Sequence, residues 1–117
     1  MRNDKENIIV AKSSSFALKI IDFSSKIETV KKYSLASQIF RSRTSIGANI
    51  REAQNAESKV DFIHKMKIAA KEADELEYWL LLCKESPHLI SPTSDLFEEL
   101  TSIICILTKI IATSKKS

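Results

Sequence analysis

The sequence predicts an all-α protein, a single domain over residues 1–117 that folds as an antiparallel up-down-up-down four-helix bundle. Glycine occurs once and proline twice, whereas 44% of the residues are hydrophobic. Sheets and phosphate-binding loops need glycine where the backbone turns tightly or approaches a ligand. The apolar residues recur at alternating spacings of three and four, which is the period of helices with one buried side. The length suits one core and excludes a multidomain enzyme.

The first predicted helix covers residues 14–32 and the second covers residues 34–56. Ser13 to Ser15 and Ser34 precede the apolar stripes, and serine is a favoured residue at helix N-termini. Ser42 fills one missing position in the second stripe. The first stripe consists of Phe16, Ile20, Phe23, Ile27 and Val30, and the second of Leu35, Ile39, Ile46, Ile50 and Ala53.

The third predicted helix covers residues 58–86 and the fourth covers residues 92–115. Ser58 and Asp61 form a variant of the capping box, and Pro87 and Pro92 separate the two helices. The third stripe consists of Phe62, Met66, Ala69, Ala73, Leu76, Leu80 and Cys83, and the fourth of Leu96, Leu100, Ile103, Leu107 and Ile110. Four stripes joined by short connections bury one another most simply in an antiparallel bundle.

The compartment predicted from the sequence is the cytoplasm. The segment from Met1 to Ala11 is too acidic, and its apolar stretch too short, for a secretory signal. The uncharged run from Leu100 to Thr108 is shorter than a membrane span. Cys83 and Cys105 both fall within apolar stretches of predicted helices and lack zinc-site spacing, so we expect two reduced core cysteines.

A second stripe on the second helix is polar throughout and lies about 100° around the helix from the apolar one. We call it the polar ladder, and it consists of Gln38, Arg41, Ser45, Asn49 and Glu52. A half-buried arginine needs partners, and Glu72 and Glu75 on the third helix are the expected ones. The ladder would either fix the register of the two helices or contact a ligand or nucleic acid.

The third helix has more apolar residues than one buried side can use. Ile68, Tyr78, Trp79 and Leu82 project on a different side from its core stripe. An isolated monomer would expose this patch, so we predict an oligomer interface there. The alternative is that the fourth helix or the N-terminal segment covers these residues.

The net charge of +3 conceals an uneven distribution along the chain. Residues 31–71 carry nine basic and three acidic residues, or +6, whereas residues 72–99 carry eight acidic residues and one lysine, or −7. Such patches attract polyanions, join copies of a protein, or are merely solvated helix faces. The residues considered for nucleic-acid binding are Arg41, Arg43, Arg51, Lys65, Lys67 and Lys71.

Catalytic motifs are not found in the sequence. His64 and His88 lie in different elements, and a di-metal bundle needs a paired acid and histidine on each of two helices. No serine nucleophile motif, Cys-His signature or phosphate loop occurs. We therefore expect no enzymatic activity, no catalytic residue, no metal and no cofactor.

The segment from Leu35 to Glu85 resembles the 23S rRNA-intervening-sequence protein family, also called the bacterial four helix bundle protein family. The resemblance extends over nearly the whole chain. The residues that carry it are Gln38, Arg41, Ser45, Ile46, Asn49, Ile50, Glu52, Asp61, Phe62, Ile68, Ala69, Lys71, Glu72, Glu75, Tyr78, Trp79 and Leu80.

The resemblance implies a small four-helix bundle that assembles as a homopentameric ring and has no established enzymatic activity. A related branch, the accessory variability proteins of diversity-generating retroelements, forms a basic pentamer that engages a reverse transcriptase and nucleic acid. We therefore expect an oligomeric accessory protein that binds RNA or DNA through phosphates. A protein-binding scaffold indifferent to nucleic acid is the alternative, because the net charge of +3 is modest.

Overall fold

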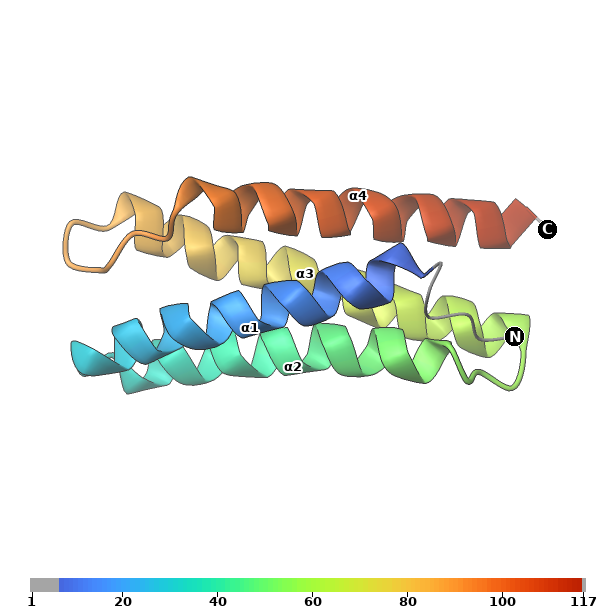
Figure 1. The fold of residues 1–117 in the computed structure, drawn as a ribbon, viewed down its shortest axis with the longest axis horizontal. Helices are drawn as coiled ribbons and strands as arrows, with labels where there is room; N and C mark the ends of the chain where they lie inside the picture. The colour runs from blue at the N-terminus through green and yellow to red at the C-terminus, as the bar shows by residue number, and fades with distance from the viewer. Residues whose placement is uncertain (1–6, 117) are drawn as a thin grey trace.

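The computed structural model describes residues 7–116, which form four α-helices (Figure 1). They are α1 (Ile8–Thr29), α2 (Tyr33–Ala53), α3 (Lys59–Glu85) and α4 (Ser94–Lys116). The helices α2 and α4 each pack against both α1 and α3, whereas α1 and α3 do not contact each other, nor do α2 and α4. In Figure 1 the α1–α2 and α3–α4 connections lie at one end of the elongated body, and the α2–α3 connection lies at the other. The prediction of a four-helix all-α domain is confirmed.

The helix α1 begins at Ile8, so the prediction that it starts at residue 14 is wrong. Asn7 is the N-cap, and its side-chain oxygen accepts a hydrogen bond from the Val10 N–H at 3.3 Å. Ser13 lies inside the helix, where its buried hydroxyl donates to the Val10 carbonyl at 3.1 Å. Serine can satisfy its hydroxyl against the preceding turn, so a serine cluster does not by itself mark a helix start.

The turn between α1 and α2 contains a Schellman motif. Lys31 adopts a left-handed conformation with φ of 61°, and its N–H donates to the Glu28 carbonyl at 2.8 Å. The Lys32 N–H donates to the Ile27 carbonyl at 3.3 Å. Val30 is the C-cap of α1 and is exposed, so its predicted place in the core stripe is wrong. The helix ends at Thr29 because these two bonds satisfy its last carbonyls.

The N-termini of α2 and α3 are stabilised differently. The N-cap of α2 is Lys32, which makes no side-chain capping bond, so Ser34 does not cap this helix as expected. For α3 the capping prediction is confirmed, because the Ser58 hydroxyl accepts from the Asp61 N–H at 3.0 Å. The Asp61 carboxylate in turn accepts from the Glu57 N–H at 3.3 Å. The first turn of α3 is therefore stabilised by two hydrogen bonds, one accepted by the Ser58 side chain and one by the Asp61 side chain.

The core is formed by the four predicted apolar stripes without Val30, together with Ile9 and Ala36, which the stripes did not include. Leu35, Phe62 and Ile110 are half-buried at its margins. Ala69 and Ala73 are completely buried on α3, where their small side chains allow the helices to approach. The largest fully buried side chains are Phe16, Ile20, Ile27, Ile39, Ile46, Ile50, Met66, Leu76, Leu80, Leu100, Ile103 and Leu107.

The two cysteines differ in their surroundings. Cys83 is buried, and burial raises the pKa of its thiol. Cys105 is exposed, so the prediction that both cysteines are core residues is wrong. Cys105 lies two residues after the buried Ile103 on α4, so its side chain points away from the core stripe. Within residues 7–116 none of the helices has an apolar stretch suited to crossing a membrane.

Candidate functional site

The polar ladder of α2 faces α3, and Arg41 is the residue that joins the two helices there. Its Nη1 donates to Glu72 Oε1 at 2.8 Å and to Oε2 at 3.2 Å, and its Nη2 donates to Glu75 Oε1. Its Nε donates to Gln38 Oε1 at 3.4 Å. The hydrogen bond to Glu72, with the charges of both carboxylates, raises the pKa of Arg41. The guanidinium is therefore held by both of the glutamates expected to pair with it.

Trp79 extends this network along α3. Its Nε1 donates to Glu75 Oε1 at 3.4 Å, and its ring centroid lies 5.3 Å from that of Tyr78. The indole is half-buried and packs against the core of its own chain. Ile68 is also half-buried, whereas Tyr78 and Leu82 are exposed. The side of α3 proposed from the sequence as an interface is therefore exposed only in part.

The rest of the polar ladder makes local contacts and one ion pair. Asn49 Nδ2 donates to the Ser45 carbonyl at 2.8 Å within α2. Glu52 pairs with Lys65 of α3 at 3.2 Å. Gln38 contacts Arg41 of its own helix. The ladder therefore connects α2 to α3 through Arg41 at one level and Glu52 at another.

Two polar atoms of α2 are buried without a hydrogen-bond partner. One is the hydroxyl of Ser42, whose residue is completely buried in the core. The other is Nε of Arg43, whose guanidinium carbon lies 4.2 Å from the centre of the Phe40 ring. Burial lowers the pKa of Arg43. The sequence pattern predicted Ser42 in the core stripe. It did not predict the contact between Arg43 and Phe40.

The six basic residues considered for nucleic-acid binding are not equivalent. Arg41 and Lys65 are neutralised by glutamates of the same chain. Arg43 stacks on Phe40. The remaining three are exposed, and they are Arg51, Lys67 and Lys71.

Lys67 of α3 lies against Lys115 near the end of α4, and we call these two residues, together with Lys71 of α3, the lysine cluster. The side chain of Lys115 lies against that of Lys67 and lowers its pKa, because two neighbouring ammonium groups repel each other. Lys71 lies one turn further along α3, on the same side as Lys67. Ion pairs within residues 7–116 involve Lys19, Arg41 and Lys65 as the cations, so no described carboxylate neutralises the cluster. The sequence pattern did not indicate Lys115.

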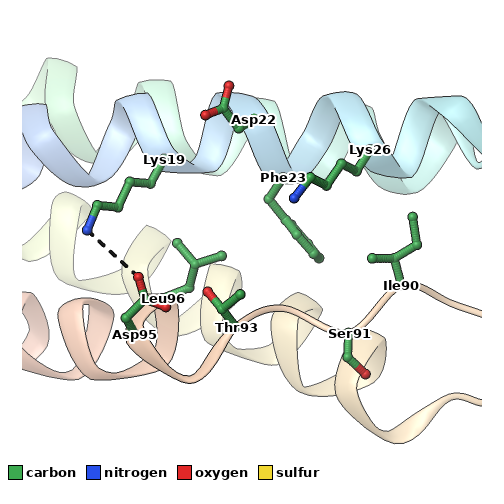
Figure 2. A pocket seen from close by; sticks show the side chains of 9 residues that line it. All are labelled: Lys19, Asp22, Phe23, Lys26, Ile90, Ser91, Thr93, Asp95 and Leu96. Carbon is green, nitrogen blue, oxygen red and sulfur yellow. Dashed lines mark ion pairs between the residues drawn. The ribbon is translucent and has the colours of Figure 1, made fainter.

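A pocket of about 280 Å³ lies between α1 and the connection that leads into α4 (Figure 2). Phe23 points into it, and Asp22 points away from the connection. Lys19 pairs with Glu99 at 2.7 Å and with Asp95 at 3.8 Å. A hydrogen bond from Thr93 is the main cause that lowers the pKa of Asp95. The pocket is smaller than most ligand sites, which measure about 300–1,000 Å³, and the ion pairs of Lys19 hold α1 to α4 beside it.

No group of three or more histidine, cysteine or acidic side chains among residues 7–116 is arranged to hold a metal ion. His64 on α3 and His88 in the α3–α4 connection are both exposed. The described residues thus define a four-helix bundle whose distinctive surfaces are a polar ladder, a lysine cluster and exposed apolar side chains.

The chain belongs to the 23S rRNA-intervening sequence protein family, whose pattern it matches over residues 5–112. It is similar to a protein of unknown function from the S23 ribosomal protein family of Bacteroides thetaiotaomicron, whose crystal structure is solved. The two chains are 40% identical with a TM-score of 0.79, and the match covers 89% of this chain and 98% of the other. No curated protein matches the chain.

Proposed function

We propose that this protein is a non-enzymatic, oligomeric accessory factor that binds RNA through phosphate contacts. The observation that carries the proposal is the lysine cluster, in which Lys67 and Lys115 lie together without a carboxylate from the described residues. Two adjacent ammonium groups repel each other in the free protein, and a polyanion relieves that repulsion. The family description, which refers to a sequence within 23S rRNA, is consistent with an RNA partner.

The residues proposed to contact phosphates differ from the six chosen on sequence alone. Arg41 and Lys65 would have to leave their glutamates to bind a phosphate, and that exchange brings little net gain. Lys67, Lys71 and Lys115 carry the proposed contacts, with Arg51 as a further exposed cation. Lysine contacts to phosphates position a nucleic acid without reading its bases.

Assembly strengthens the proposed binding. We propose that copies of the chain form a closed ring, for which the family resemblance implies five subunits. Each subunit contributes one lysine cluster, so a ring would present several clusters to one RNA molecule. Linked weak sites gain affinity because each later contact is intramolecular.

A scaffold that binds another protein is the second candidate function. The observation that favours it is the exposure of Tyr78, Leu81 and Leu82 on α3, at 55%, 42% and 38%. A reverse transcriptase is the partner that the related retroelement branch suggests. This candidate predicts that the protein does not bind nucleic acid.

The test is a salt titration of binding to a structured RNA. In the triple variant Lys67→Gln, Lys71→Gln and Lys115→Gln, we expect weaker binding at low salt. The slope of log affinity against log salt should become shallower by about 2–3, since each of the three lost phosphate contacts removes about 0.7–0.9. The control is Lys12→Gln, Lys26→Gln and Lys109→Gln, which removes the same charge elsewhere. Equal loss in both variants, or no binding by the unmodified protein at low salt, would overturn the proposal.

A further inference from the structure

A second pocket, of about 550 Å³, lies at the end of the bundle that carries both the α1–α2 and the α3–α4 connection (Figure 1). We call it the end pocket. One wall comes from the α1–α2 connection and the first turn of α2, and the other comes from the residues that follow α3. Its volume lies within the range of small-molecule sites, which is about 300–1,000 Å³.

Both walls of the end pocket are fixed by hydrogen bonds within the chain. On one side, the Schellman motif holds Lys31 and Lys32 through bonds to carbonyls of α1. On the other, the Ser86 hydroxyl accepts from the His88 N–H at 3.2 Å, and the Ser86 carbonyl accepts from the Leu89 N–H at 3.4 Å. The pocket is therefore formed before a ligand arrives, which lowers the entropic cost of binding.

The end pocket is lined by two lysines and a histidine, Lys31, Lys32 and His88, and by no carboxylate among residues 7–116. All three side chains are exposed at its mouth. Neither lysine takes part in an ion pair with a described carboxylate. The acidic residues nearest along the chain are Glu28 and Glu85, and neither lines the pocket. The lining therefore favours an anionic group.

The N-terminus of α2 adds backbone donors to the same wall. Lys32 is the N-cap and makes no side-chain capping bond. Tyr33 and Ser34 follow it and line the pocket. The N–H groups of a first helical turn have no acceptor within the helix, and phosphate oxygens accept from such groups. These donors supplement the lysine ammonium groups, and together they suit a phosphate.

An aromatic ring and two aliphatic side chains complete the lining. Tyr33 is 63% exposed, so its ring is free to stack on a ligand. Leu35 and Leu89 are half-buried against the core and give the pocket an apolar base. Nucleic-acid bases stack on aromatic side chains of this kind. The end pocket therefore matches a ligand that combines a planar ring with a phosphate.

We propose that the end pocket binds a 5′-mononucleotide, with its phosphate on Lys31 and Lys32 and its base against Tyr33. A free nucleotide and the 5′-phosphorylated end of an RNA strand both carry this chemistry. The inference goes beyond the proposed function and does not depend on it. The lysine cluster includes Lys115 near the end of α4, which lies toward the opposite end of the body (Figure 1).

The test is calorimetric titration of the full chain with AMP, adenosine and inorganic phosphate. AMP should bind more tightly than the other two, because it alone has both the ring and the phosphate. The double variant Lys31→Gln and Lys32→Gln should weaken AMP binding by about tenfold or more, since hydrogen bonds to charged groups are the stronger ones. Tyr33→Leu should weaken AMP binding by about fivefold or more through lost stacking and leave phosphate binding unchanged.

The matched control is the double variant Lys12→Gln and Lys109→Gln, which removes the same charge from exposed positions elsewhere. It should leave AMP binding unchanged, as should the triple variant of the lysine cluster. Circular dichroism should show that all variants remain helical. Loss of structured-RNA binding in the triple variant, with AMP binding retained, would concern the proposed function alone.

Two RNA tetranucleotides that differ only in a 5′-phosphate or a 5′-hydroxyl group distinguish the two sources of the ligand. Tighter binding of the phosphorylated strand than of AMP would assign the pocket to a strand end, whereas equal affinity would assign it to a single nucleotide. The preference for the phosphorylated strand should disappear in the Lys31 and Lys32 variant. The proposal fails if neither AMP nor this strand binds at millimolar concentration, or if the pocket and control variants weaken binding equally.

Discussion

Arg41 and Glu72 join α2 to α3 through a guanidinium nitrogen that lies 2.8 Å from one carboxylate oxygen and 3.2 Å from the other. The arginine side chain is 48% exposed and that of Glu72 is 13% exposed. Water solvates the exposed arginine when the pair is separated. Most of the loss in free energy of unfolding therefore comes from the carboxylate of Glu72, which is nearly buried.

For this pair we predict that Arg41→Ala lowers the thermal midpoint more than Glu72→Gln does. The first change leaves a nearly buried carboxylate uncompensated, whereas the second retains a hydrogen-bond acceptor. The double variant should be less destabilised than the sum of the two single variants, because the two residues share one interaction. Thermal denaturation of all four proteins measures this coupling, and strict additivity would show that the contact is energetically unimportant.

Ser42→Ala should stabilise the bundle by about 1 kcal/mol, because removing a completely buried hydroxyl without a hydrogen-bond partner relieves a desolvation penalty. The matched control is Ser13→Ala, where the lost hydroxyl donates to the Val10 carbonyl at 3.1 Å and the change should be nearly neutral. Chemical denaturation gives both free energies of unfolding. A destabilised Ser42→Ala variant would mean that this hydroxyl has a partner in the native protein.

Lys31→Gly should raise the free energy of unfolding by about 0.5–1 kcal/mol, since glycine adopts positive φ without a steric cost. Lys31 has φ of 61°, and the left-handed region costs a residue with a side chain about 1–2 kcal/mol. Glycine avoids that cost but loses more entropy on folding, which reduces the gain. Lys31→Ala should bring no comparable benefit, because alanine retains the Cβ atom. Equal stability of the two variants would contradict the role assigned to this turn.

Gly47→Ala should stabilise the bundle. A methyl group at this position meets open space within the chain, so we expect the free energy of unfolding to rise by about 0.5–1 kcal/mol. Chemical denaturation measures the change. A destabilised variant would show that the added methyl group has no free space in the native protein.

The core was predictable because its pattern depends on a single period. Phe16, Ile39, Leu76 and Leu100 are buried where the spacing places them, since any residue on the inner side of an amphipathic helix meets the other helices. The acidic partners of Arg41 were predictable for a related reason. A long cation at the shoulder of a bundle can reach the nearest acids on the next helix.

The remaining features depend on contacts that sequence spacing does not encode. The serines at 13–15 resemble a cap, yet Asn7 caps α1 because its own side chain reaches the backbone of Val10. Lys31 has a left-handed backbone conformation at a helix end, where glycine is the residue expected from sequence. Trp79 is half-buried because it packs against the core, which depends on how the helices meet. Lys115 joins Lys67 through the meeting of α3 and α4, far apart in sequence.

The most direct measurement is size-exclusion chromatography with light scattering of the full chain, alone and with a structured RNA, at low and at high salt. The proposed function predicts an oligomer several times the mass of one chain, which is 13.2 kDa. It also predicts that this oligomer elutes with the RNA at low salt and separates from it as the salt concentration rises. A monomeric species that elutes apart from the RNA at low salt would contradict it.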